Sequence, residues 1–262
     1  MGNQEQELHI AVRKGHAAAV ERVLANGTNI NCLFYGWTPL QLAIETGNQD
    51  MATLLLEKGC DFQLHDKNSK SPFEEAIMKK QNKVMKVLLQ KGMSSNQTLS
   101  CGRTPLTYAA AEGSVELLNI LLKGGADVNL PDSQGHTALY LCAKQGQDEA
   151  MKVLLSAGAD ANYVCMQEGG FTPLIAAASN EHLQTATILI KHGCDLNMQD
   201  DDGWSALWHA YSNSSDDVCK ALLRAGADKS IPNKEGVSIV QDAKNNEDET
   251  MLELFQKCNN LV

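Results

Sequence analysis

The chain has 262 residues and a formal net charge of −10 at pH 7. The acidic excess lies in the second half, because residues 1–131 hold 13 basic and 13 acidic residues whereas residues 132–262 hold 9 and 19. This balance argues against a nucleic-acid-binding protein, whose surface is normally basic. The sequence has no apolar run of membrane-spanning length and no signal-peptide pattern, so we expect no membrane association and a cytoplasmic or nuclear location.

An internal repeat runs along the chain and is marked by glycine. Each mark follows an apolar stretch with helical spacing, such as residues 117–122, and glycine readily adopts the left-handed conformation that ends a helix. The marks are 32, 33, 33, 33, 35 and 33 residues apart: Gly27, Gly59, Gly92, Gly125, Gly158, Gly193 and Gly226. A regular spacing in this range predicts a protein of stacked repeats.

A second pattern predicts where another helix begins in each repeat. A hydroxyl residue able to cap a helix is followed by Pro or Ala, and Pro is well suited to the first helical position. The caps are Thr38, Ser71, Thr104, Thr137, Thr172 and Ser205. Glycines just before these caps predict turns, so each repeat reads as turn, short helix, loop and helix.

These repeats resemble the ankyrin repeat. The fourth follows the family pattern at Leu106, Ala109, Ala110, Gly113, Leu121, Leu122, Gly125, Ala126, Asp127, Val128 and Asn129. The resemblance implies an all-α solenoid with short β-hairpin or turn fingers, in which fingers and first helices line a concave face. It places seven repeats and a C-terminal cap in one domain, residues 1–262, at about 4–32, 33–65, 66–98, 99–131, 132–164, 165–199, 200–232 and 233–258.

The sequence gives no sign of catalysis or of a bound metal or cofactor. Its seven histidines are scattered, and no hydrolase, metalloprotease or phosphate-loop motif accompanies them. His9 stands in the family's histidine position, so we expect it to bridge adjacent repeats. The eight cysteines form no C-x-x-C pair, and Cys60 and Cys194 replace alanines of other repeats, which predicts small core residues. We therefore expect a non-enzymatic protein.

Aromatic and acidic residues suggest a binding surface in the fifth to seventh repeats. Trp204 and Trp208 are four residues apart and share one helix face, and Phe171 and Tyr140 hold equivalent positions in earlier repeats. The acidic residues beside them are Asp200, Asp201 and Asp202. Large exposed aromatic residues concentrate at interfaces, although the same rings could instead fill gaps between fingers.

Two further fingers depart from the pattern. Tyr35 and Trp37 belong to a second aromatic finger, which we include among the candidate peptide-binding residues. Residues 163–171 contain two residues more than the usual finger, and insertions in repeat proteins often fall on the binding face. A neutral insertion in a surface loop explains the extra length equally well.

The leading hypothesis is an adaptor that binds an extended, basic peptide of a protein partner in the concave groove, with a monomer favoured. Aromatic faces and carboxylates together suit Arg or Lys side chains. One alternative is a reader of methylated lysine in histone tails. Another is a scaffold for a large folded partner, which would also use the basic third repeat at Lys79, Lys80, Lys83 and Lys86. The chain could also be the repeat region of a longer ubiquitin-ligase or signalling adaptor.

The third repeat departs furthest from the family pattern. Ser69 replaces the turn glycine, and Lys80 replaces the glycine between the two helices. After the helix-ending glycine, Met93, Ser94 and Ser95 replace the usual Ala-Asp-Val. Because a repeat array is stabilised by each repeat and its interfaces, we expect the third repeat to be the weakest part of the stack.

Overall fold

The computed structural model describes residues 2–65 and 70–259, so the position of Ser69 lies outside the described residues. The chain forms two compact units. The N-terminal unit comprises residues 1–101 and 119–126, and the C-terminal unit comprises residues 102–118 and 127–262. That the two units form one continuous domain, as the sequence predicts, stays a prediction.

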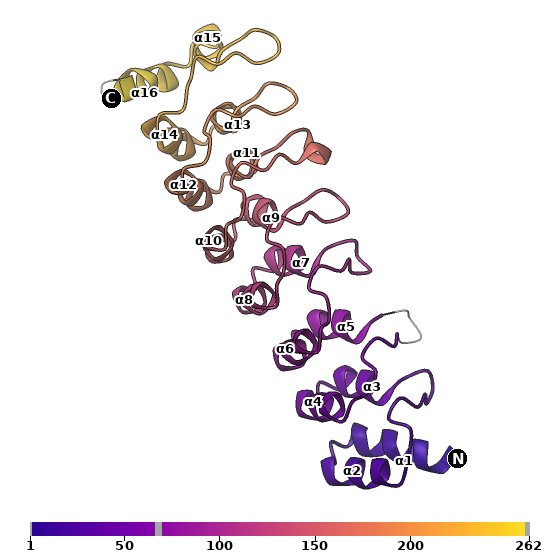
Figure 1. Ribbon diagram of the computed structural model, residues 1–262. Coiled ribbons are helices and arrows are strands. Elements are labelled where there is room, and N and C mark those ends of the chain that lie inside the picture. Colours follow the sequence, from indigo (N-terminus) through magenta and orange to yellow (C-terminus); the bar gives the residue numbers. More distant parts are fainter. Residues whose placement is uncertain (1, 66–69, 260–262) are drawn as a thin grey trace. The chain divides into compact units, whose positions relative to one another are not determined.

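The N-terminal unit consists of stacked helix pairs (Figure 1). Its helices are α1 (Gly2–Arg13), α2 (Ala17–Ala25), α3 (Pro39–Glu45), α4 (Gln49–Glu57), α5 (Pro72–Met78) and α6 (Asn82–Gln90). The first helices α1, α3 and α5 pack side by side, and α4 packs on α6. The next helix, α8 (Val115–Lys123), is divided between the two units.

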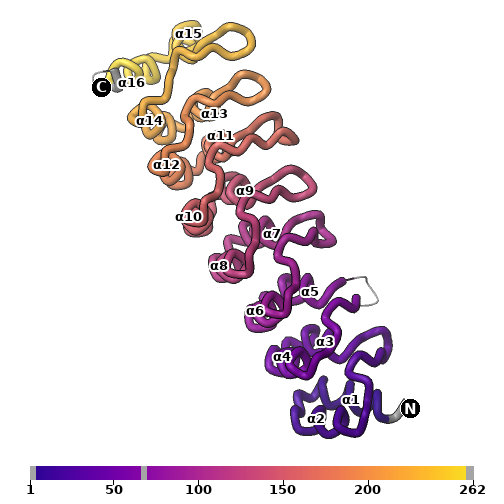
Figure 2. The backbone as a smooth tube through the Cα atoms, in the orientation of Figure 1, coloured from indigo at the N-terminus to yellow at the C-terminus, as the bar shows by residue number. Residues whose placement is uncertain are grey.

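The C-terminal unit repeats this arrangement. It contains α7 (Pro105–Ala111), α9 (Ala138–Gln145), α10 (Asp148–Ser156), the 3-10 turn η1 (Met166–Glu168), α11 (Pro173–Ser179), α12 (Leu183–His192), α13 (Ala206–Ser212), α14 (Asp216–Arg224), α15 (Ile239–Asn245) and α16 (Glu249–Asn259). The first helices pack in the order α7, α9, α11 and α13, and the second helices in the order α10, α12, α14 and α16. Within this unit the fingers project on the side of the first helices (Figure 2).

The predicted helix starts are confirmed. Each hydroxyl cap accepts a hydrogen bond from the backbone N–H three residues later, as Thr38 does from Gln41. The prolines of this pattern, including Pro39, occupy the first helical position. These caps satisfy amides that a helix start leaves without partners, and so they fix where each first helix begins.

The predicted helix ends and the fold class are also confirmed. All seven repeat-marking glycines have φ between 83° and 94°, the left-handed region that β-carbons disfavour. Among the described residues no strand forms, and the fingers contain isolated β-bridges such as Phe34 with Trp37. Each unit is therefore an all-α array of repeats with turn fingers.

Small buried residues follow the helix-ending glycines. Cys60 and Cys194 are buried as predicted, and burial raises the pKa of the Cys60 thiol to about 12 and that of Cys194 to about 11. Both cysteines therefore remain protonated and act as small apolar residues. His9 bridges two repeats, because its Nε2 lies 2.9 Å from the carbonyl oxygen of Trp37.

Candidate functional site

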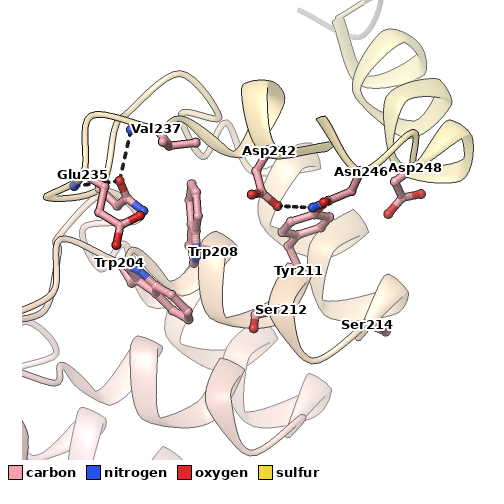
Figure 3. A pocket seen from close by; sticks show the side chains of 11 residues that line it. Trp204, Trp208, Tyr211, Ser212, Ser214, Glu235, Val237, Asp242, Asn246 and Asp248 are labelled. Atoms are coloured by element: carbon pink, nitrogen blue, oxygen red, sulfur yellow. Dashed lines mark hydrogen bonds between the residues drawn. The ribbon is translucent and has the colours of Figure 1, made fainter. Parts of the chain in front are cut away.

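A pocket of about 440 Å³ lies on the finger side of the C-terminal unit, where α13 faces α15 (Figure 3). Close packing of first helices continues from α7 to α13 but is not repeated between α13 and α15. The pocket is lined by Trp204, Trp208, Tyr211, Ser212, Ser214, Asn233, Glu235, Val237, Asp242, Asn246 and Asp248. It therefore belongs to the seventh and eighth repeats.

A change at one sequence position accompanies this opening. Tyr211 stands where three earlier repeats have Ala110, Ala143 and Ala178 and two have Ile44 and Ile77, all fully buried. A methyl group permits close approach of the next helix, whereas a phenol ring requires more space. Tyr211 thus contributes one wall of the cavity.

Three aromatic side chains and Val237 form the apolar part of the pocket. The rings of Trp204 and Trp208 are 5.6 Å apart at an angle of 44°. Trp208 is only 7% exposed, while Trp204 is half-buried. In Figure 3 the two indoles lie beside the finger that carries Glu235, and Tyr211 lies next to Asn246 and Asp242. Indole and phenol faces attract cations, and the attraction increases as water is removed.

Three carboxylates, those of Glu235, Asp242 and Asp248, line the same pocket, and no Lys or Arg does. None of the three forms an ion pair with a described residue. Asp242 Oδ2 accepts a 2.8 Å hydrogen bond from Asn246, and Asp248 caps α16 through the Met251 N–H. Partial burial, followed by interactions with Asp242, raises the pKa of Tyr211, which stays neutral beside these acids.

Of the predicted peptide-binding residues, the pocket contains Trp204 and Trp208. The expectation that Asp200 faces a partner is wrong, because its side chain is turned into the finger and the residue is 8% exposed. Its Oδ1 accepts the backbone N–H groups of Asp202 and Trp204, and its Oδ2 lies 2.7 Å from His209 Nε2. Asp200 therefore holds the turn in shape.

The same turn occurs in two other fingers. Asp132 accepts the N–H groups of Gln134 and His136, and Asn233 accepts those of Glu235 and Val237. In each case the acceptor stands three residues before the turn glycine, a spacing visible in the sequence. This short-range hydrogen bonding is typical of Asp and Asn in turns.

Tyr140 is a second correction, since it is fully buried and lines no exposed strip. Its ring stacks on His136 at 5.4 Å, and the Lys144 ammonium lies 5.9 Å from the ring centre. Phe171 is half-buried and packs edge-on against His209 at 5.0 Å. The aromatic strip expected through these residues is thus interrupted by packing between fingers.

Asp201 and Asp202 are exposed at the finger tip but do not line the pocket. Their backbones join neighbouring fingers: the Asp201 N–H donates to the Gly169 carbonyl, and the Asp202 carbonyl accepts from the Lys234 N–H. Both carboxylates contribute negative potential near the site without forming its wall.

The long finger of residues 163–171 is attached to the fifth repeat. The Tyr163 hydroxyl donates to the Gly135 carbonyl at 2.8 Å. Glu168 Oε1 accepts from Lys144 Nζ at 2.8 Å and lies 2.9 Å from His136 Nε2. The inserted residues therefore reinforce the contact between two repeats.

Tyr35 and Trp37 lie in the N-terminal unit, in a separate pocket of about 210 Å³.

The basic third repeat belongs to the same unit, and part of its charge is neutralised. Lys79 Nζ lies 2.9 Å from Glu45, and Lys83 pairs with Asp50. Neither lysine is available to a partner without breaking an existing ion pair.

The described residues contain no cluster of three or more side chains arranged to hold a metal ion. In the same part of the chain, no helix combines the length and apolar character that a membrane crossing needs.

Comparison with known proteins identifies the family. A model described as ankyrin repeats (3 copies) matches residues 8–98, 73–165 and 158–233. The chain belongs to the ankyrin-repeat family, whose repeats are protein-interaction modules. In agreement, the crystal structure of the ankyrin repeat domain of Bcl-3 resembles this chain with a TM-score of 0.67 and 26% identity, over 90% of this chain and 92% of that one.

Curated relatives match over short stretches. The mouse (Mus musculus) 2-5A-dependent ribonuclease is 38% identical over 65 residues, which is 24% of this chain and 9% of that protein. A putative ankyrin repeat protein of fowlpox virus (strain NVSL), FPV240, is 46% identical over 59 residues, or 22% of this chain and 14% of the other. Rat (Rattus norvegicus) protein phosphatase 1 regulatory subunit 12A is 29% identical over 86 residues, or 29% and 8%. The chain thus spans a small part of each relative's length.

Proposed function

We propose that this chain is a non-enzymatic recognition module that binds a basic segment of a partner protein through the pocket between α13 and α15. The observation that carries the proposal is the composition of that pocket, with three aromatic rings and three carboxylates that form no ion pair within the described part of the chain. A Lys or Arg side chain of a partner supplies the missing charge, and its aliphatic part contacts the rings.

The electrostatics of the surrounding unit favour the same ligand. Asp201 and Asp202 are exposed nearby, and the acidic excess of the chain falls in residues 132–262. A negative surface attracts basic segments and accelerates their encounter. The sequence predicts a groove across the fifth to seventh repeats. We propose the seventh and eighth repeats instead, because Tyr140 is buried in packing and Asp200 is buried in its own turn.

Panning a random-peptide phage library on the full chain tests this proposal. We expect enriched peptides to contain Arg or Lys, and replacement of that Arg by neutral citrulline to weaken binding about tenfold, the effect of losing one charge-assisted contact. The double variant E235Q/D242N should cause a similar loss.

The matched control is D216N/D217N, which removes the same charge from α14 without altering the pocket wall. Equal weakening by both double variants would assign binding to net charge and contradict a pocket. Selected peptides that lack basic residues, or that bind the W204A variant unchanged, would also overturn the proposal.

A methylated lysine is the second candidate ligand for this pocket. Recognition of a methylated ammonium requires rings on several sides, and Tyr211 adds a third ring to the Trp204 and Trp208 pair. Titration with matched histone-tail peptides distinguishes the candidates. Tighter binding of the methylated form would support a methyl-lysine reader, whereas equal affinity would exclude it.

A further inference from the structure

The N-terminal unit carries an exposed apolar surface around its first finger. Four large hydrophobic residues are exposed in the described part of the chain, and three of them belong here: Ile10 at 45%, Leu33 at 63% and Tyr35 at 85%. Ile10 and Tyr35 line the 210 Å³ pocket together with His9, Arg13, Phe34, Trp37 and Leu42. Exposed apolar surface of this kind marks interaction sites in soluble proteins.

The finger that presents Tyr35 is unusually tight. Gly36 follows the helix-ending Gly27 by nine residues, one fewer than separate Gly193 from Gly203. Phe34 and Trp37 exchange two backbone hydrogen bonds, so Tyr35 and Gly36 form a two-residue turn with φ of 52° and 79°. Such a turn favours Asn or Gly at its first central position, where a bulky residue is strained. The chain thus keeps an exposed aromatic ring at a position where local conformation disfavours it, which points to a role in binding.

The walls of this pocket are held in place. His9 is buried and its two ring nitrogens lie 2.9 Å from the carbonyl oxygens of Glu5 and Trp37, which fixes the finger to α1. The Phe34 ring lies 5.4 Å from the His9 ring and 4.5 Å from the Tyr35 ring. A fixed pocket loses little conformational entropy when a ligand binds.

The charge at this pocket is opposite to that of the C-terminal unit's pocket. Arg13 is its only lining residue with a full charge, no carboxylate lines it, and Arg13 forms no ion pair with a described residue. Tyr, Trp and Arg are also the residues most often found at the energetic centre of protein interfaces. A ligand that matches this pocket carries an apolar side chain beside a carboxylate.

We infer that the pocket formed by Ile10, Arg13, Tyr35 and Trp37 is a second recognition site, which binds a partner segment holding a large apolar residue next to Asp or Glu. The apolar side chain enters between Ile10 and the aromatic finger, and the carboxylate pairs with the Arg13 guanidinium. The site is independent of the pocket between α13 and α15 and has the opposite charge preference.

The test uses a random-peptide phage library panned on the full chain. From the enriched peptides we select those that bind the Y35G variant more weakly than the unaltered chain. Tyr35→Gly removes the ring and relieves the left-handed strain, so the fold is retained or stabilised. We expect the sorted peptides to hold Leu, Ile, Met or Phe next to Asp or Glu, and to bind Y35G about tenfold more weakly, as for a moderate hot spot. Met166→Ser, which removes a 65% exposed apolar side chain of the C-terminal unit, is the control and should have no effect.

A charge exchange tests the role of Arg13. Arg13→Glu should weaken the acidic peptides about tenfold, and replacing the peptide's acidic residue by Lys should restore binding to this variant. Absence of Tyr35-dependent peptides, or Tyr35-dependent peptides without an acidic residue, would overturn the inference. If no peptide is selected, and sedimentation shows self-association of the chain that the Y35G variant lacks, the surface binds a second copy of the chain. That result would also overturn the inference. Peptides whose binding is weakened by Trp204→Ala but not by Tyr35→Gly bind the pocket between α13 and α15. The tests of the two pockets can therefore be distinguished.

Discussion

Among the described residues, left-handed residues other than glycine occur at the finger residue Tyr35 and at one repeated position, between the two helices of a repeat. Glu181, Ser214 and Glu247 share this position with Lys80, whereas Gly47 occupies it in the second repeat. The substitution at Lys80 seen in the sequence is therefore not peculiar to the third repeat. A β-carbon in this conformation costs about 1 kcal/mol.

Glu181→Gly should raise the free energy of unfolding by roughly 0.5–1 kcal/mol, because glycine adopts φ near 59° without strain. Gly47→Glu should lower it by a similar amount, since an added β-carbon there meets no atom within 4 Å and only the conformation is penalised. Urea denaturation measures both. A loss of stability in the glycine variant would show that Glu181 makes a stabilising contact instead.

The two tryptophans of the C-terminal pocket should respond differently to truncation. Trp208 is 7% exposed, so Trp208→Ala should cost about 3–5 kcal/mol of unfolding free energy by leaving a cavity. Trp204 is half-buried, and Trp204→Ala should cost less than about 2 kcal/mol. Denaturation followed by circular dichroism compares them, and equal losses would contradict the described wall. Trp204→Ala is consequently the better variant for binding experiments.

At the scale of the element, the finger containing η1 has a pH-dependent attachment. Hydrogen bonds from Lys144 and then from His136 hold the pKa of Glu168 below its ordinary value. Because the folded-state pKa is the lower one, the stabilisation is complete above the ordinary carboxyl pKa of about 4.3 and is lost as pH falls through the folded-state value. Glu168→Gln should lower Tm at neutral pH and flatten the decline in Tm on acidification.

The control for this prediction is Glu149→Gln, which removes an exposed pair with Lys152 and should change Tm little. Parallel Tm profiles for wild type and Glu168→Gln between neutral and acidic pH would show that the finger is not attached through this carboxylate.

The third repeat should open more readily than the repeats that follow it in sequence. Two buried polar atoms within it, Gln81 Oε1 and Gln97 Nε2, have no hydrogen-bond partner, and such atoms destabilise the folded state. By contrast, Thr104 and Thr107 form a reciprocal capping box at α7. Amide exchange should therefore be faster in residues 70–98 than in residues 104–160. Equal protection of the two segments would contradict this.

Sequence reasoning located the elements well because their boundaries depend on local chemistry. Hydroxyl caps, first-turn prolines and left-handed glycines act within a few residues, so the pattern alone places each helix. The site was found only in part. Position in the repeat does not reveal depth. The pattern therefore predicts exposed side chains at Tyr140 and Asp200, whereas Tyr140 is packed and Asp200 closes its own turn.

The missed side of the pocket had a signal in the sequence. Tyr211 places an aromatic ring where earlier repeats have Ala110, Ala143 and Ala178 or Ile44 and Ile77, and this larger ring favours a wider gap to the next first helix. Asp242 and Asp248 belong to the eighth repeat, which the family resemblance predicts only as a C-terminal cap. A cavity between two repeats depends on packing across them, and no single repeat shows it.

At the scale of the molecule, charge distribution should govern the rate of recognition. The C-terminal unit's acidic surface should accelerate association with a basic peptide at low salt, and the rate should fall as ionic strength shortens the screening length. Stopped-flow measurements over a salt series test this. An association rate independent of salt would show that the acidic surface takes no part in the encounter.

Tryptophan fluorescence tests the central claim most directly. The chain has three tryptophans, so Trp37→Phe leaves Trp204 and Trp208, both of which line the pocket between α13 and α15. We predict that an arginine-containing peptide selected by panning changes the fluorescence of this variant to saturation, and that its citrulline counterpart binds about tenfold more weakly. Binding of the arginine peptide without any fluorescence change, or equal affinity for the two peptides, would contradict recognition of a cationic side chain in this pocket.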